Sequence, residues 1–158
     1  MPGKPRRLAV VSTKGTLDMA YPPFILASTA AAMGYEVGVF FSFYGLQLLK
    51  RSLDHVKVSP LANPAMPMPL PIPTLAMAMP GMEELTTRVM KDTMKEKGIA
   101  SLEELRAICQ EAGVLFFACD MTMKMFDFKD SDFIEGVEIG GAATFLDFAS
   151  DADIQLFV

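Results

Sequence analysis

The stretch VLFFACDMTMKMF, from Val114 to Phe126, decides the expected fold. Its first part, Val114 to Ala118, is entirely apolar and short. An apolar run without alternation, preceded by a helical pattern, is typical of a strand that is buried on both faces of a parallel sheet. The run ends at Cys119 and Asp120, and a second apolar segment with a helical pattern follows. The sequence therefore predicts a buried strand that passes directly into a helix at Cys119.

The position of Cys119 has two interpretations. Open α/β sheets place their chemistry at the carboxyl ends of the strands, where the amides of the next helix stabilise a thiolate and lower its pKa. A cysteine at that point is also a small apolar residue that can complete a core strand without reacting. Position alone favours neither interpretation, so both stay open at this stage.

The rest of the chain repeats the alternation of strand and helix. Strands are expected at residues 8–12, 36–43, 114–118, 137–141 and 153–158. Helical patterns cover residues 19–33, 45–51, 83–97, 102–112, 121–126 and 142–150. This order predicts one α/β domain over residues 1–158, with a mostly parallel five-stranded, flavodoxin-like sheet and helices on both faces.

Local signals add detail to the helices. Asp18 is the predicted N-cap of the first helix, because its side chain can accept a hydrogen bond from the first turn. The residues expected on the inner face of the helix 83–97 are Leu85, Val89, Met90 and Met94. Cys109 falls on the apolar face of the helix 102–112, which indicates a core position and no catalytic role.

Composition limits the function. The chain has 158 residues, 51% of them apolar, a mean hydropathy of +0.32 and a net charge of −5. The acidic balance argues against a nucleic-acid surface. The high apolar fraction indicates surface that is buried against other chains, and so a homo-oligomer. Two cysteines and the lack of a signal-peptide pattern predict a reducing cytoplasm, and no proline-free apolar run is long enough for a membrane helix.

Residues 59–81 form a segment of different character. Prolines alternate there with methionine, leucine and isoleucine, which excludes a regular helix or a central strand and favours an extended polyproline conformation. Almost every other side chain is apolar, so we expect this Pro/Met-rich excursion to pack on its own subunit, a neighbour, a partner or a membrane surface.

A second interpretation of the methionines is Cu(I) binding, because soft thioether sulfur suits that ion. Methionine is more often flexible packing material. The residues concerned are Met66, Met68, Met77, Met79, Met121, Met123 and Met125.

Two further features are weak as sites. The turn from Thr13 to Leu17 lacks the glycine and lysine spacing of a phosphate-binding loop, so we expect it to line a cleft rather than bind a nucleotide. His55 has no second histidine or cysteine nearby and is expected at the surface. No metal site and no cofactor are therefore predicted.

At this level of detail the chain resembles a known family. The strand 8–12, the helix from Asp18 to Met33, Cys119 within LFFACDM and the pair Gly140–Gly141 are similar to the DsrE/DsrF-like family, in particular its long-loop members, often labelled peroxiredoxin-like. The resemblance implies a small cytoplasmic α/β subunit that assembles into homo- or hetero-oligomers. Several members carry sulfane sulfur as a cysteine persulfide, and by this resemblance Cys119 would be the carrier.

The resemblance implies a sulfur-carrier or sulfurtransferase subunit, with sulfur donor and acceptor proteins as partners. Some relatives use a second cysteine, but Cys109 falls within a predicted helix. The alternative is a non-catalytic oligomeric module that recruits a partner, a ligand or Cu(I) through the Pro/Met-rich excursion, which also allows peripheral membrane contact. The residues expected to contact a substrate beside Cys119 are Asp120, Thr13, Tyr44, Gly140 and Gly141.

Overall fold

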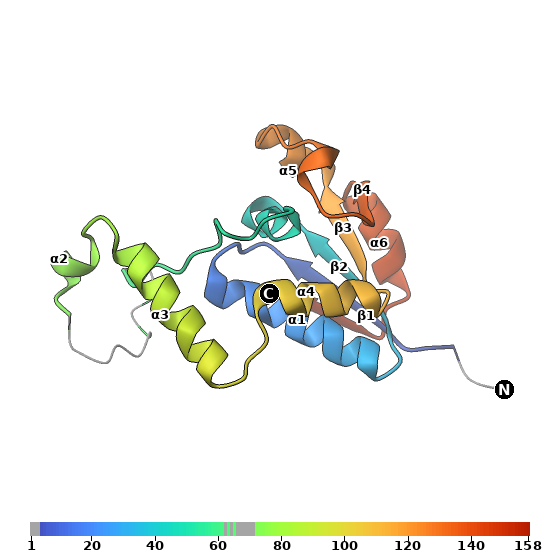
Figure 1. Cartoon of the computed structure of the whole chain (residues 1–158). Coiled ribbons are helices and arrows are strands. Elements are labelled where there is room, and N and C mark those ends of the chain that lie inside the picture. Colours follow the sequence, from blue (N-terminus) through green and yellow to red (C-terminus); the bar gives the residue numbers. More distant parts are fainter. Residues whose placement is uncertain (1–3, 62, 64, 66–71) are drawn as a thin grey trace.

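Five short strands pair side by side in one parallel sheet (Figure 1). The computed structural model describes residues 4–61, 63, 65 and 72–158. The strand order is β4-β3-β2-β1-β5, and all four pairings are parallel. The α/β fold predicted from the sequence is therefore confirmed. The strands are β1 (Arg7–Ser12), β2 (Glu36–Phe41), β3 (Leu115–Cys119), β4 (Val137–Gly140) and β5 (Ile154–Phe157).

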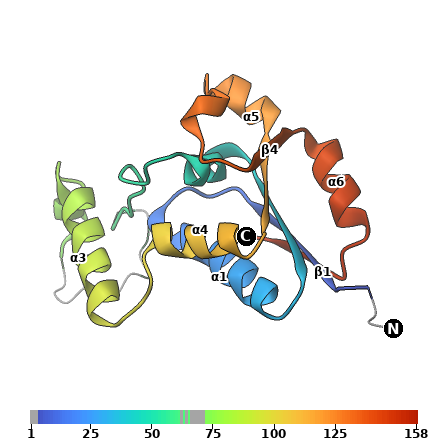
Figure 2. The same cartoon turned by 45° about the vertical axis from the view of Figure 1, so that its right-hand side comes forward.

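Helices cover both faces of this sheet. The helices α1 and α4 pack together on one face and α6 packs on the other, as Figure 2 shows. The helical elements are α1 (Leu17–Ala32), the 3₁₀ helix η1 (Phe43–Leu49), α2 (Thr74–Met77), α3 (Met82–Glu96), α4 (Leu102–Glu111), α5 (Asp120–Met125), the 3₁₀ helix η2 (Asp130–Asp132) and α6 (Ala142–Ser150).

The strand order explains this division of the helices. The chain crosses the sheet in one direction from β1 to β4 and then returns past β1 to place β5 on the far edge. Crossover connections between parallel strands of one sheet are almost always right-handed. Connections made in the first direction therefore lie on one face, and the return through α6 lies on the other.

The alternation along β3 divides its side chains between the two faces. Phe116 and Ala118 belong to the larger core under α1 and α4, where Phe116 packs edge-on against Phe41. Phe117 and Cys119 belong to the smaller core under α6. Full burial of a phenylalanine contributes roughly 1.5–3 kcal/mol, so slipping β3 by one residue would exchange the two sets and lose both cores.

The first helix begins earlier than predicted. Thr16, not Asp18, is the N-cap of α1, although its side chain makes no cap hydrogen bond. The Leu17 amide donates to the Lys57 carbonyl over 2.9 Å, which holds the chain at that point and lets the helix start there. The Asp18 carboxylate instead accepts a hydrogen bond from the Asn63 side chain, at 3.0 Å.

The predicted inner face of the third helix is right in part, because Met90 and Met94 pack against the larger core. Leu85 and Val89 are half exposed, and the buried residues of α3 are Thr86 and Thr87. Thr87 Oγ1 accepts a hydrogen bond from the Val58 amide over 3.0 Å. The buried face of α3 is therefore defined by this hydrogen bond to the segment before the excursion together with the packing of Met90 and Met94.

The described part of the Pro/Met-rich excursion contains a short helix, contrary to the expectation that none could form. The four residues of α2 fall in the proline-free stretch between Pro73 and Pro80. Leu75 and Met79 are exposed on this chain, at 86% and 62% of their surface. Met66 and Met68 lie outside the described residues, so that part of the predicted packing and Cu(I) site stays a prediction.

Two glycines allow the turns after β1 and β2 to touch. A Cβ on Gly15 would lie 2.4 Å from the Tyr44 carbonyl oxygen, and a Cβ on Gly45 would lie 2.3 Å from the Ser12 carbonyl oxygen. Both distances are far inside van der Waals contact, and both obstacles are backbone atoms. The carboxyl edge of the sheet is thus held together by contacts that only glycine permits.

Replacing Gly45 by alanine should therefore destabilise the fold. We expect Gly45→Ala to lower the free energy of unfolding by about 1–3 kcal/mol, because the methyl group forces the two turns apart. Gly141→Ala is the matched control: its nearest atom would be 3.6 Å away, so a change within about 0.5 kcal/mol is expected. Urea denaturation of both variants measures this, and equal midpoints would contradict the close approach.

Candidate functional site

Cys119 ends one element and starts the next. It is the last residue of β3 and the N-cap of α5, with an extended backbone (φ −69°, ψ 112°). An N-cap side chain faces the free amides of the first helical turn, which here belong to Met121 and Thr122. The thiol itself makes no cap hydrogen bond. We expect these contacts to tighten when the sulfur becomes an anion, because charged acceptors draw donors closer.

The surroundings of Cys119 favour its thiolate. Burial is the largest influence on its pKa and raises it. The hydroxyl and amide of Thr122, the hydroxyl of Ser42 and the amide of Met121 act in the opposite direction, and together they leave the pKa of Cys119 below the ordinary thiol value. The net effect is a cysteine that ionises more readily than its burial alone would allow.

The two hydroxyls form a buried pair beside the sulfur. Ser42 Oγ and Thr122 Oγ1 are 3.3 Å apart, and Thr122 is fully buried. The Phe43 amide donates to Thr122 Oγ1 over 3.1 Å, so the single Thr122 proton is free for the sulfur or for Ser42. Phe43 itself adopts a left-handed backbone (φ 47°), which is strained for a bulky residue and lies next to this buried pair.

Three of the predicted substrate-binding residues do lie beside Cys119. Gly140 is its partner in the β3–β4 register. Gly141 is the N-cap of α6, and a Cβ there would lie 3.6 Å from Asp120 Oδ1. The Asp120 carboxylate also accepts from Lys124 at 3.4 Å, in an exposed pair. The starts of α5 and α6 therefore meet around the cysteine.

The other two predicted residues have different neighbours in the structure. Thr13 follows β1, two strands away from β3, or roughly 10 Å across the sheet. Its amide donates to the Val158 carbonyl. Tyr44 is largely exposed in η1, with its ring 6.0 Å from that of Phe126. Both residues border a neighbouring part of the carboxyl edge instead.

Cys109 provides the contrast to Cys119. It is fully buried in α4, as predicted, and its Sγ donates to the Phe24 carbonyl over 3.5 Å. Burial raises the pKa of Cys109 to about 11, so it stays a neutral thiol at physiological pH. Both cysteines are free.

Sequence reasoning missed Ser42 and Thr122. A signal for each exists in hindsight. Phe41, the last residue of β2, pairs with Ala118, so Ser42 directly after it lies at the level of Cys119. Thr122 is the third residue after the cysteine, where the first turn of a helix returns a side chain to its cap.

The described residues contain neither a cluster of candidate metal ligands nor a membrane-spanning helix. No group of three or more histidine, cysteine, aspartate or glutamate side chains there is arranged to hold a metal ion. No helix of that part is long and apolar enough to cross a membrane.

A parallel five-stranded sheet with helices on both faces, and a cysteine that caps the helix after its third strand, defines a small single-domain α/β protein. The chain belongs to the DsrE/DsrF/DrsH-like family, whose model matches residues 4–157. This confirms the resemblance inferred from the sequence.

Individual relatives agree with this assignment. The chain is 56% identical over 157 residues to the sulfur carrier protein DsrE2 of Allochromatium vinosum, covering 97% of this chain and 98% of that protein. It is 29% identical over 158 residues to the uncharacterized protein YrkE of Bacillus subtilis, covering 97% of each. The crystal structure of the ychN protein from E. coli has a similar fold, with a TM-score of 0.55 at 11% identity over 97% of this chain and 99% of that one.

Removing the Thr122 hydroxyl should make Cys119 harder to ionise. In a Cys109→Ser background, we expect Thr122→Val to move the pH profile of Cys119 alkylation to higher pH and to slow alkylation at neutral pH about three- to tenfold. Thr122→Ser keeps a hydroxyl and should restore the profile. Because Thr122→Val also leaves the buried Phe43 amide without its partner, unfolding is measured alongside. An unshifted profile in a folded Thr122→Val variant would contradict this role.

Proposed function

We propose that this chain is a sulfur carrier that holds sulfane sulfur as a persulfide on Cys119 and passes it between thiol proteins. The observation that carries the proposal is the position of Cys119 at the N-cap of α5, beside the Ser42 and Thr122 hydroxyls that favour its thiolate, in a chain 56% identical to a protein named as a sulfur carrier. Sulfur donor and acceptor proteins are the partners this role requires, and the activity is that of a sulfurtransferase.

The chemistry needs an anionic sulfur and donors that stabilise it. The Cys119 thiolate attacks the outer sulfur of a donor persulfide, forms a new S–S bond and releases the donor as a thiolate. An acceptor thiolate then attacks the outer sulfur on Cys119, and the Cys119 thiolate leaves. Each step breaks one S–S bond and makes one, so no external oxidant is consumed. The Ser42 and Thr122 hydroxyls favour the thiolate that attacks in the first step and leaves in the second.

Access to the sulfur requires a local movement. Cys119 is only 5% exposed and lies in one cluster with Phe145 and Ala149 of α6. The first turn of α6 follows Gly140 and Gly141, neither of which places a side chain between the helix and β3. Displacing this turn would open the sulfur to a donor. A persulfide held behind it is shielded from water and stray thiols between transfers.

The setting that fits this role is a reducing compartment, and we propose the cytoplasm. Both cysteines are free thiols, and a persulfide carrier needs its thiol kept from forming a structural disulfide. A homo-oligomer is part of the proposal, because exposed Leu75 and Met79 would otherwise leave apolar surface in water.

Sulfur loading tests the proposal directly. Intact mass spectrometry after incubation with polysulfide should show additions in steps of one sulfur atom, lost in Cys119→Ser and retained in Cys109→Ser. The reason is the difference between a stabilised thiolate and a buried thiol with a pKa of about 11.

Transfer onward is the second half of this test. Loaded protein should lose its sulfur to an added small thiol, and the free Cys119 thiol should return. Loading that survives Cys119→Ser but disappears in Cys109→Ser would reverse the assignment of the carrier.

The alternative function is a binding module without catalysis, which the exposed apolar side chains around α2 favour. Pro73, Leu75, Met79 and Pro80 line an apolar groove there. In that case Cys119 would be inert and a partner would occupy the groove.

The groove also generates a prediction about assembly. The double variant Leu75→Gln/Met79→Gln should have a lower mass by light scattering than the parent. Full burial of each apolar side chain between subunits stabilises the oligomer by roughly 1.5–3 kcal/mol, and the polar replacements remove this stabilisation. Leu85→Gln on α3 is the matched control, being exposed but outside the groove. An unchanged mass in the double variant would show that the groove does not support assembly.

A further inference from the structure

A cavity of about 480 Å³ lies at the carboxyl edge of the sheet, apart from Cys119. Its volume is within the roughly 300–1,000 Å³ typical of small-molecule sites. Two features that the proposed function leaves unused meet in it, namely the turn after β1 and the lone histidine. The lining residues are Lys14, Gly15, Thr16, Tyr44, Gln47, Lys50 and His55.

The lining is cationic in an acidic protein. Lys14, Lys50 and His55 contribute to it, and no aspartate or glutamate does. The chain as a whole carries a net charge of −5, so this is a local reversal of sign. Asp54, the nearest acidic residue in sequence, is hydrogen-bonded to Ser52 Oγ at 2.7 Å.

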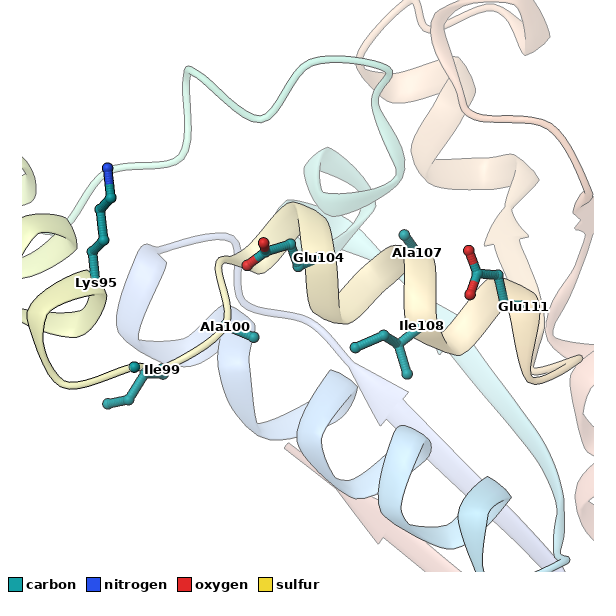
Figure 3. Close-up of a pocket in the computed structure, with 8 residues that line it drawn as sticks. Lys95, Ile99, Ala100, Glu104, Ala107, Ile108 and Glu111 are labelled. Atoms are coloured by element: carbon teal, nitrogen blue, oxygen red, sulfur yellow. The ribbon is translucent and has the colours of Figure 1, made fainter.

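Other cavities of the described residues lack this character. The open cavity beside α4 places Glu104 and Glu111 on either side of Ala107 and Ile108, with only Lys95 to balance them (Figure 3). The groove at α2 is apolar. Charge, rather than size, therefore distinguishes the cavity at the sheet edge.

Close backbone packing forms part of the cavity wall. The Gly15 turn rests against the Tyr44 carbonyl, in a contact that a Cβ would forbid. Lys50 lies with its Nζ 4.0 Å from the centre of the Phe128 ring, which restrains the side chain without neutralising it. The hydroxyls of Thr16 and Tyr44 add neutral donors to the same lining.

We infer that this cavity binds a tetrahedral oxyanion, either free in solution or as the phosphate of a small molecule. The two lysine side chains supply positive charge. The imidazole takes up a proton when the anion binds and then donates a hydrogen bond to it, and the hydroxyls donate the remaining hydrogen bonds. The inference does not depend on sulfur chemistry at Cys119, so the two can fail separately.

His55 reports on occupancy, because it is the only histidine in the chain. Partial burial lowers the pKa of His55, Lys50 and Arg106 lower it further, and the Gln47 carbonyl and Asp54 act in the other direction. A bound anion would offset the lysine charge and raise this pKa. By linkage, affinity for the anion should increase as pH falls through the pKa of the imidazole.

The test is a proton NMR titration of the His55 ring in tag-free protein. Sulfate, inorganic phosphate and glycerol phosphate are added separately, with chloride at equal ionic strength as the reference. We expect a saturable shift and a raised His55 pKa with sulfate, which stays a dianion across this pH range. Tighter binding of glycerol phosphate than of inorganic phosphate would identify a phosphorylated small molecule as the source, and equal or weaker binding would identify the free anion.

Single-residue variants distinguish anion binding in this cavity from a general effect of salt on the charges of the protein. Lys14→Gln should weaken binding about tenfold, as expected for the loss of one charged hydrogen bond. Lys97→Gln, which removes an exposed lysine outside the cavity, should not weaken it. Cys119→Ser should bind as tightly as the parent. A response that is linear in salt, equal to that of chloride or unchanged in Lys14→Gln would overturn the inference.

Discussion

Cys119 is both the last residue of β3 and the N-cap of α5, and these two constraints on its backbone fix the position of the sulfur. Pairing with β2 and β4 holds the strand side of the junction, and the first turn of α5 brings Thr122 back toward the sulfur. The same register places Ser42, the residue after β2, at the level of Cys119. Desolvation by the core and stabilisation by hydroxyls and amides are therefore consequences of one junction, and their balance decides the ionisation of the thiol.

The sequence was sufficient for the sheet and its order of elements, because buried parallel strands are continuous apolar runs and the helices between them have their own periodicity. It also separated Cys119 from Cys109, since one follows a strand and the other lies on a helix face. Thr13 and Tyr44 were placed with the cysteine because both follow strands of the same sheet. Strand order, which a sequence does not display, separates Thr13 from it by two strands.

Other features could not be predicted, because tertiary contacts outweighed local pattern. The buried face of α3 is defined in part by a hydrogen bond between Thr87 and Val58, which are far apart in the chain, and Leu85 is left exposed although its spacing indicates burial. The hydroxyl pair of Ser42 and Thr122 likewise joins segments about 80 residues apart, so the position of each residue beside its own strand or helix end does not reveal that the two hydroxyls meet.

On the second face of the sheet, α6 both covers the cysteine and leads into β5 at the far edge. The Gln155 side chain ties that strand back to the Ala149 carbonyl over 2.9 Å. A shift of α6 that uncovers the sulfur therefore pulls on an edge strand two positions beyond β2. The helix that covers Cys119 and the edge strand β5 are thus joined by a side-chain hydrogen bond as well as by the chain itself, so a movement of α6 is resisted at the edge of the sheet.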